Sequence, residues 1–234
     1  LSGTGPNAGG PLYLLRLLAQ RPADAALRAV ENAATSAKPP VRGMDVGTRG
    51  RNADQALAAL RRWALAAASP SLAAACDALA GRSPAGRWRT LAGATGEANL
   101  YAVLPRDAVV CLAETEADRL AQLAAVLAAG SRAVWPADAR ALWERLPQEA
   151  RDRVALARNW RSATVHFDAV LHSGPRESLR EVCRALAERP GPIVGVTGLA
   201  PGDADVPLER LVFERSLSVN TAAAGGNASL MTIG

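Results

Sequence analysis

The sequence predicts an α/β protein whose centre is a Rossmann-like parallel sheet. From residue 107 onwards, short apolar runs alternate with longer segments that have helical spacing. Such alternation is typical of βαβ units, in which helices cover both faces of a buried sheet. In addition, 49% of the 234 residues are hydrophobic, which is enough for one sizeable core.

The first 54 residues are predicted to contain little regular structure. Residues 1–10 hold four glycines, so we expect an N-terminal arm of irregular backbone. Leucines at helical spacing predict a helix over 11–20. Residues 21–54 mix a weak helical stretch over 24–34 with several prolines and glycines, which predicts a linker.

Two helices and a pair of strands are predicted next. Asp54 is a suitable N-cap for a helix through Ala64, and Pro70 opens a second helix that runs to about residue 79. Over 87–104, short alternating stretches separated by glycines favour strands.

The segment after residue 107 carries the βαβ pattern. Its predicted strands and helices follow one another along the chain. The strands are predicted at 108–112, 132–135, 154–157, 167–171 and 192–196. The helices are predicted at 116–129, 136–146 and 175–188.

The C-terminus is predicted to be a long strand over 209–220 followed by a tail over 221–234. Leu211, Phe213, Leu217 and Val219 alternate with polar residues, which predicts one covered face. No residue after Arg215 is charged. An uncharged terminus can be a flexible tail, but we favour a segment that pairs with a sheet edge of another domain or subunit.

Composition excludes several kinds of site. Two histidines and three widely spaced cysteines do not support a metal centre, a disulfide framework or a thiol-redox pair, so we expect no metal and a reducing, cytoplasmic location. No long apolar run predicts membrane insertion. The formal charge is +5, but basic and acidic residues are interleaved, so nucleic-acid binding by this region is not expected.

A dinucleotide-binding sequence is absent from the first strand–helix junction. A Rossmann fold that binds a dinucleotide carries GxGxxG there, because only glycine lets the backbone approach the pyrophosphate. In this chain the junction reads Ala-Glu-Thr-Glu, and Glu114 and Glu116 would repel a phosphate. We therefore expect the fold without its usual ligand.

The sequence also predicts no catalytic residue. Cys111 lies within a predicted buried strand and Cys183 beside Val182 on a predicted helix, so both are expected in the core. His166 and His172 flank one strand and are expected to be structural or exposed.

The segments 1–14, 96–101 and 214–234 together resemble one family, the proline utilization A (PutA) enzymes. Residues 1–14 resemble the end of the aldehyde dehydrogenase domain of these bifunctional proline catabolic enzymes. Residues 96–101, with Pro105-Arg106 and Val110-Cys111, resemble the entry to an aldehyde dehydrogenase nucleotide domain. The stretch 214–234 resembles the terminus of the longer family members and is the most specific of the three.

The resemblance implies a division of the chain. It makes residues 1–20 the tail end of the catalytic aldehyde dehydrogenase domain, 21–54 a linker, and 55–234 an aldehyde dehydrogenase-like but noncatalytic C-terminal domain. The parent would bind FAD and NAD, whereas this fragment is expected to bind neither and to be inactive. Its implied partners are the catalytic domains of the same chain or of a second subunit.

The resemblance also implies individual site residues. Ser2 and Gly3 would help to anchor the carboxylate of the aldehyde substrate. Glu116 would stand where active relatives place an oxyanion-stabilising Asn, so that position is lost. The residues expected to dock onto another domain are Asn220, Gly225, Gly226, Asn227, Ser229 and Met231.

Two functions are thus predicted from different premises. The resemblance implies a noncatalytic module that covers the passage of a reactive intermediate and supports the aldehyde dehydrogenase site and assembly. The βαβ pattern alone favours a free-standing NAD-binding dehydrogenase domain.

Overall fold

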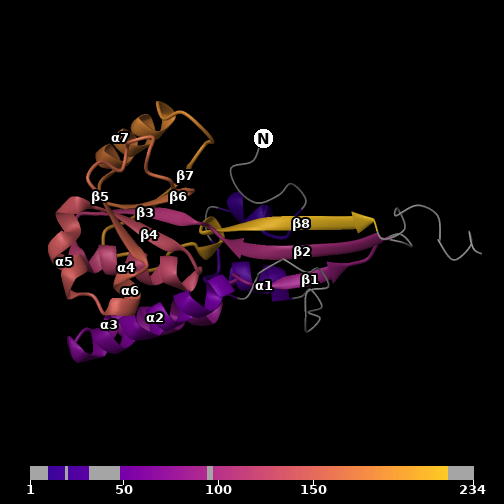
Figure 1. Ribbon diagram of the computed structural model, residues 1–234, viewed down its shortest axis with the longest axis horizontal. Helices are drawn as coiled ribbons and strands as arrows, with labels where there is room; N and C mark the ends of the chain where they lie inside the picture. The colour runs from indigo at the N-terminus through magenta and orange to yellow at the C-terminus, as the bar shows by residue number, and fades with distance from the viewer. Residues whose placement is uncertain (1–9, 19–20, 32–47, 94–96, 221–234) are drawn as a thin grey trace, which may run out of the picture.

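Two sheets organise the chain in a computed structural model that describes residues 10–18, 21–31, 48–93 and 97–220. The larger sheet is parallel and has five strands in the order β5-β4-β3-β6-β7 (Figure 1). Its strands are β3 (Ala108–Ala113), β4 (Arg132–Pro136), β5 (Val154–Ala157), β6 (Ala169–Ser173) and β7 (Gly195–Leu199). The predicted Rossmann-like parallel sheet is therefore confirmed.

Alternating residues of the central strand β3 pack into two different hydrophobic clusters. Val109 and Cys111 of β3 belong to the main hydrophobic cluster, whereas Ala108 and Val110 belong to a second cluster that includes Val182. This alternation follows from the period of two along a strand. Both faces of the sheet are covered.

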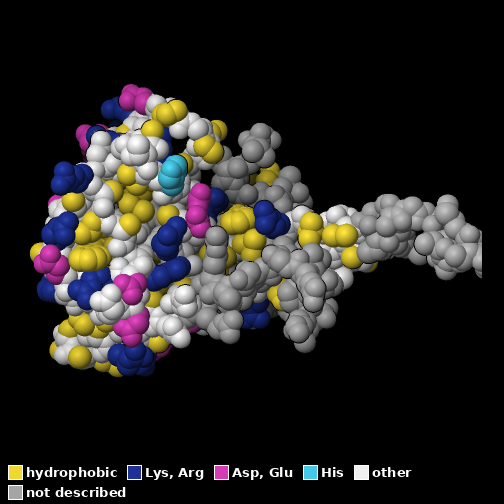
Figure 2. All heavy atoms as spheres, in the orientation of Figure 1, with side chains coloured by type: hydrophobic (Ala, Val, Ile, Leu, Met, Phe, Trp, Pro, Cys, Tyr) yellow, Lys and Arg dark blue, Asp and Glu magenta, His cyan; other side chains and the backbone are white. Residues whose placement is uncertain are grey.

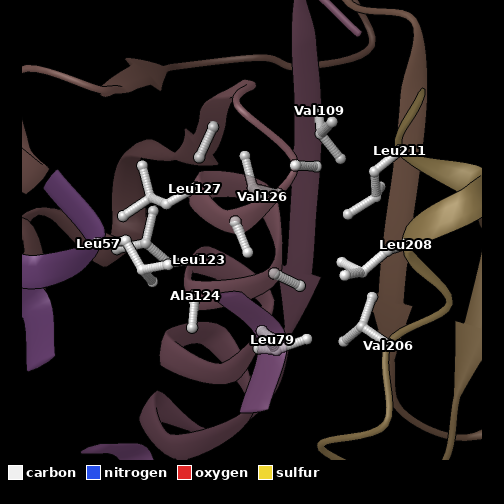
Figure 3. Close-up of a cluster of buried hydrophobic side chains, with 14 of the residues drawn as sticks. Leu57, Leu79, Val109, Leu123, Ala124, Val126, Leu127, Val206, Leu208 and Leu211 are labelled. Carbon is white, nitrogen blue, oxygen red and sulfur yellow. The ribbon is translucent and has the colours of Figure 1, made fainter. Parts of the chain in front are cut away.

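Helices pack in two layers against the main core. Helix α4 (Glu116–Ala128) lies next to β3, and helices α2 (Thr48–Ala66) and α3 (Pro70–Arg82) pack outside it. Figure 3 shows Leu123 and Leu127 of α4 pointing towards Leu57 of α2. The opposite face is covered by α7 (Arg176–Ala187), whose one buried residue is Val182.

The smaller sheet is antiparallel and extends away from the main body (Figure 1). Its order is β1-β2-β8, formed by β1 (Trp88–Leu91), β2 (Glu97–Pro105) and β8 (Val212–Asn220). Strands β2 and β8 pair along their whole length, from Glu97 opposite Asn220 to Pro105 opposite Val212. A long ladder of this kind makes the two strands one stiff ribbon, which leads to the tail.

One carboxylate of β8 is buried although sequence alternation placed it on the exposed face. Glu214 is 5% exposed, accepts a hydrogen bond of 2.7 Å from the Tyr101 hydroxyl and one of 3.3 Å from the Leu12 backbone N–H. A Cβ at Gly10 would lie 2.4 Å from the Glu214 carboxylate. The backbone at residue 10 can approach this carboxylate closely because glycine has no side chain. The prediction of one covered face is therefore wrong at this point of the strand.

Several element boundaries differ from those predicted. The helix expected over 11–20 is a short 3₁₀ turn, η1 (Leu14–Arg16), and the terminal strand begins at Val212 because residues 208–210 form the 3₁₀ turn η3. The expected helix over 136–146 divides into η2 (Ala137–Ala139) and α5 (Arg140–Arg145). A further short helix, α6 (Gln148–Arg151), precedes β5.

The region predicted as a linker is partly helical. It contains α1 (Ala25–Glu31), whose Ala26 and Val30 join the main core, and the first turns of α2. Because α2 begins at Thr48, Asp54 lies inside the helix and does not cap it. The division of the chain into domains stays a prediction.

Candidate functional site

The carboxyl ends of β3 and β6 mark the place where an open α/β sheet binds its ligands. The chain runs from β3 outward to β4 and β5 on one side, and from β6 to β7 on the other, so the strand order reverses between β3 and β6. A crevice forms at such a switch point and receives the ligand in doubly wound folds. In this chain α4 begins at that edge.

The N-terminus of α4 is capped by the chain itself. Thr115 Oγ1 accepts a hydrogen bond of 3.1 Å from the Asp118 backbone N–H, and its hydroxyl donates one of 2.8 Å to the Asp118 carboxylate. That carboxylate is 5% exposed and accepts the Gly202 N–H at 2.8 Å, which ties the loop after β7 to the helix. A carboxylate therefore occupies the position that favours anions.

Gln122, one turn further along α4, joins the two strand ends. Its side chain is fully buried, and Nε2 donates to the Leu112 carbonyl of β3 at 3.0 Å and to Ser173 Oγ of β6 at 2.8 Å. These two contacts span the switch point. The space between the strand ends is thus bridged by an internal hydrogen-bonded side chain.

Arg119 closes the same edge from the side of β4. Its guanidinium donates to the Ala113 carbonyl at 2.6 Å, lies 3.5 Å from Asp138 and stacks over the Trp135 ring at 6.0 Å. The side chain is only 11% exposed. Its charge is therefore committed to internal partners rather than presented to a phosphate.

Glu116 lies at the first position of α4 and faces solvent. It forms an ion pair with Arg145, and their side chains are 61% and 55% exposed. A carboxylate accepts hydrogen bonds and donates none when ionised, so it cannot stabilise an oxyanion. The assignment of Glu116 to a lost oxyanion position remains a prediction.

The two histidines lie in different environments. His172 is 5% exposed on β6, and its Nε2 lies 2.9 Å from the Ser178 hydroxyl oxygen, whereas His166 is exposed in the loop before the strand. Burial lowers the pKa of His172, and the nearby Glu114 carboxylate acts in the opposite direction. His172 therefore stays neutral at pH 7, as a structural residue.

Two cysteines are buried and one is exposed. Burial raises the pKa of Cys111 to about 12 and that of Cys76 to about 11, so neither is a thiolate at neutral pH. The core position predicted for Cys111 is confirmed. The same prediction for Cys183 is wrong, because α7 turns only Val182 into the core and exposes the next residue.

Most residues predicted to dock onto another domain lie outside the described part of the chain. Asn220 ends β8, opposite Glu97. Ser2 and Gly3 lie outside the described residues. The same is true of the predicted docking residues in the tail, which are Gly225, Gly226, Asn227, Ser229 and Met231. These assignments stay predictions.

Basic and acidic side chains are interspersed on the face drawn in Figure 2. Among the described residues no cluster of three or more His, Cys, Asp or Glu side chains could hold a metal ion. In the same part of the chain, no helix has the length and apolar character needed to cross a membrane.

Two residues that organise the structure were not singled out from the sequence. Gln122 is the one polar residue within the apolar run 120–129, which is the signal that could have revealed it. Glu214 has no such local signal, because the groups that bury it come from residues 10–12 and 101.

The fold and this site define a Rossmann-like α/β protein whose ligand-binding edge is occupied by its own side chains. No protein-family model matches the sequence. The Bifunctional protein PutA of Escherichia coli (strain K12) is 51% identical over 236 residues, and that of Rhizobium meliloti is 36% identical over 241 residues. Both matches include 100% of this chain, so it is homologous throughout to one region of the PutA proteins, and the resemblance is confirmed.

The chain spans 17% of the length of the Escherichia coli protein and 18% of that from Rhizobium meliloti. Among solved structures, a Bradyrhizobium japonicum proline utilization A variant is 22% identical, with a TM-score of 0.46 over 78% of this chain and 22% of that one. An NAD-dependent benzaldehyde dehydrogenase from Corynebacterium glutamicum is 16% identical, with a TM-score of 0.42 over 75% and 44%.

Proposed function

We propose that this chain is a noncatalytic module of a PutA-type bifunctional enzyme that oxidises proline to glutamate. In that enzyme the module covers the passage of the reactive intermediate and supports the aldehyde dehydrogenase site and assembly. FAD and NAD are bound by the catalytic domains, which are its partners within the same cytoplasmic polypeptide or in a second subunit. The proposal is supported by the match of the whole chain to PutA.

The observation that carries the noncatalytic role is the bridge made by Gln122. A dinucleotide needs free backbone N–H groups and room for its pyrophosphate at the switch point. Here the Gln122 amide donates to the Leu112 carbonyl and to Ser173 Oγ, and Thr115 caps the helix that would face the phosphates. Nucleotide binding would require these contacts to break, which opposes a dehydrogenase activity of this chain.

The geometry of β8 supports the covering role. Within the described part of the chain, β8 pairs with β2 alone, and its last residue leads directly into the tail over 221–234. The tail is uncharged and rich in Gly and Ala, so it suits a close approach to another backbone and adds no amine, thiol or imidazole nucleophile to a passage. We assign docking to Asn220 and the tail residues, and carboxylate anchoring to Ser2 and Gly3.

Removal of the tail from the longer polypeptide tests the covering role. We expect deletion of residues 221–234 to slow the coupled conversion of proline to glutamate several-fold while leaving proline oxidation unchanged. A matched control replaces the same residues by a Gly-Ser segment of equal length, which keeps the length but not the chemistry. If both the coupled rate and oxidation of added semialdehyde stay at the wild-type level after deletion, the covering role is refuted.

The alternative is a free-standing NAD-binding dehydrogenase domain. The five-stranded parallel sheet favours it, because this architecture serves nucleotide binding in many proteins. Calorimetric titration of the 234-residue chain with NAD separates the two functions. Micromolar binding would support the alternative, and absence of heat at millimolar NAD would support the noncatalytic module.

A further inference from the structure

Three arginines line a cavity at the amino-terminal edge of the parallel sheet. The cavity has a volume of about 290 Å³, and its lining residues are Arg106, Asp107, Gly130, Arg132 and Arg153. Ligands of open α/β sheets bind at the opposite edge, beyond the carboxyl ends of the strands. This cavity is therefore separate from the edge that Gln122 bridges.

Parallel pairing brings three of the charged residues together. Asp107 directly precedes β3, Arg132 opens β4 and Arg153 directly precedes β5, and these strands are neighbours in the sheet. The Arg132 N–H donates to the Asp107 carbonyl at 3.2 Å, and the Ala133 N–H donates to the Arg153 carbonyl at 2.8 Å. The ladder itself thus holds the three positions side by side.

Arg106 reaches the same cavity from the base of the ribbon that β2 and β8 form. Its backbone N–H donates to the Leu211 carbonyl at 3.0 Å, and its Nε donates to the Arg210 carbonyl at 3.3 Å. Residues 210 and 211 come just before β8, so these bonds fix Arg106 where the ribbon begins. A ligand in the cavity would contact both the ribbon and the starts of the strands.

The lining carries more positive than negative charge. Three guanidinium groups and the Asp107 carboxylate leave a formal charge of +2. Arg132 and Asp107 form an ion pair of 3.8 Å with side chains 57% and 59% exposed, and exposed pairs of this kind bind weakly. The neighbouring Asp168 is not a lining residue, and its Oδ2 accepts the Asp107 N–H at 2.7 Å. Because like charges in one cavity repel each other, an anion there would be stabilising.

Arg153 counteracts a feature that would repel an anion. Gly130 and Ser131 follow the C-terminus of α4, where the helix dipole is negative. Nη2 of Arg153 donates to the Gly130 carbonyl at 2.8 Å and to the Ser131 carbonyl at 3.0 Å. These carbonyls are uncharged, so the guanidinium keeps its positive charge while it covers them.

We infer that this cavity binds a phosphate group, either as the free ion or as part of a phosphate monoester. A guanidinium donates in a planar fork that matches phosphate oxygens. A phosphate monoester carries a charge of about −1.5 to −2 at pH 7, which balances the lining charge, and its three acceptor oxygens suit donors that approach from separate segments of the chain. A carboxylate has only two oxygens in one plane. The inference goes beyond the noncatalytic role of the chain and does not depend on it.

Equilibrium dialysis of the longer PutA-type polypeptide against radiolabelled inorganic phosphate tests the inference. NAD is present at saturation to fill the nucleotide sites of the catalytic domains, and chloride keeps the ionic strength constant. We expect Arg132→Gln to weaken phosphate binding at least about tenfold, because it removes a charge-assisted donor. Asp107→Asn should strengthen it about two- to fivefold, because it removes the opposing carboxylate. Both side chains are exposed, so neither variant disturbs the core.

The matched control is Arg184→Gln, which removes an exposed arginine of α7 and should leave phosphate binding unchanged. Equal affinities of wild type and Arg132→Gln would overturn the inference. An equal loss in Arg132→Gln and Arg184→Gln would also overturn it, because the phosphate would then respond only to the basic surface as a whole. Weaker binding by Asp107→Asn would contradict the charge balance on which the inference rests.

Competition by glycerol 3-phosphate distinguishes the two sources of the phosphate group. An ester that displaces labelled phosphate from wild type, and does so about tenfold less well from Arg132→Gln, identifies a phosphate monoester as the ligand. An ester that does not displace it identifies the free ion, because the cavity then has no room for the attached group.

Discussion

The hydroxyl of Tyr101 on β2 donates a hydrogen bond of 2.7 Å to the Glu214 carboxylate on β8, and both side chains are 5% exposed. In the antiparallel register Tyr101 faces Ser216, so the bond runs diagonally across the ladder. The same carboxylate receives the Leu12 N–H. One acidic group therefore joins the N-terminal segment to both strands of the projecting ribbon.

Replacement of Tyr101 by Phe should destabilise the chain by about 1–3 kcal/mol, because it leaves a buried carboxylate without one of its donors. Urea unfolding of wild type and Tyr101→Phe measures the difference. The control Ser218→Ala changes an exposed residue of β8 and should alter the free energy of unfolding by less than about 0.5 kcal/mol. Equal stabilities of wild type and Tyr101→Phe would contradict the role given to this bond.

Gln122→Ala should also destabilise the fold, by about 1–3 kcal/mol, since it removes the amide that bridges β3 and β6 and leaves a cavity. Ser173→Ala should cost less, because the amide keeps its bond to the Leu112 carbonyl. Chemical denaturation checks both values against Gln55→Ala, which changes an exposed glutamine of α2. A Gln122→Ala variant as stable as this control would show that the bridge does not hold the strand ends together.

Stability should fall as the pH drops below about 6.5, through His172. Burial depresses the pKa of this residue in the folded chain, so between the unfolded and folded pKa values the unfolded state binds more protons. The contribution of His172 to the free energy of unfolding is therefore complete above about pH 6.5. It is lost progressively as the pH falls towards the pKa of His172 in the folded chain. The free energy of unfolding should differ less between pH 7.5 and pH 5.5 in His172→Gln than in wild type. The variant of the exposed histidine, His166→Gln, should show no such reduction. The opposite ranking of the two variants would refute the assignment.

One thiol per folded chain should react rapidly with a disulfide reagent at pH 8. Cys183 is exposed, whereas burial raises the pKa values of Cys111 and Cys76 to about 12 and about 11. A thiolate is the reacting species, so the two buried groups lack both access and charge. Cys183→Ser should abolish the fast phase and leave two slow thiols that react only on unfolding. A fast phase that persists in this variant would show that a buried cysteine is accessible.

Much of the parallel sheet could be predicted from the sequence, because its strands are continuous apolar runs. The run 108–112 becomes β3, and the residues at 154–157 form β5 with the expected bounds. Local periodicity was a poorer guide at the N-terminus, where leucine spacing indicated a helix but Leu14–Arg16 form only a 3₁₀ turn. Packing of Leu12 and Leu15 into a core built by distant strands overrides the local preference there.

For the candidate site, the sequence could predict only that the usual phosphate-binding motif is missing. The missing glycines and the carboxylates at 114 and 116 could be read directly, and they pointed to a fold without its usual phosphate cradle. The bridge from Gln122 to Ser173 could not be read, because its partners lie 51 positions apart and meet only when β3 and β6 become neighbours.

The sequence by itself thus determined the fold class and the resemblance to PutA. These properties depend on residue types and short-range spacing, which hold in any conformation of the chain. The tertiary structure alone decided that Glu214 is buried and that Gln122 bridges the strand ends at the switch point. Each of these depends on groups brought together from distant positions, since burial and hydrogen bonding are properties of the packed chain rather than of local pattern.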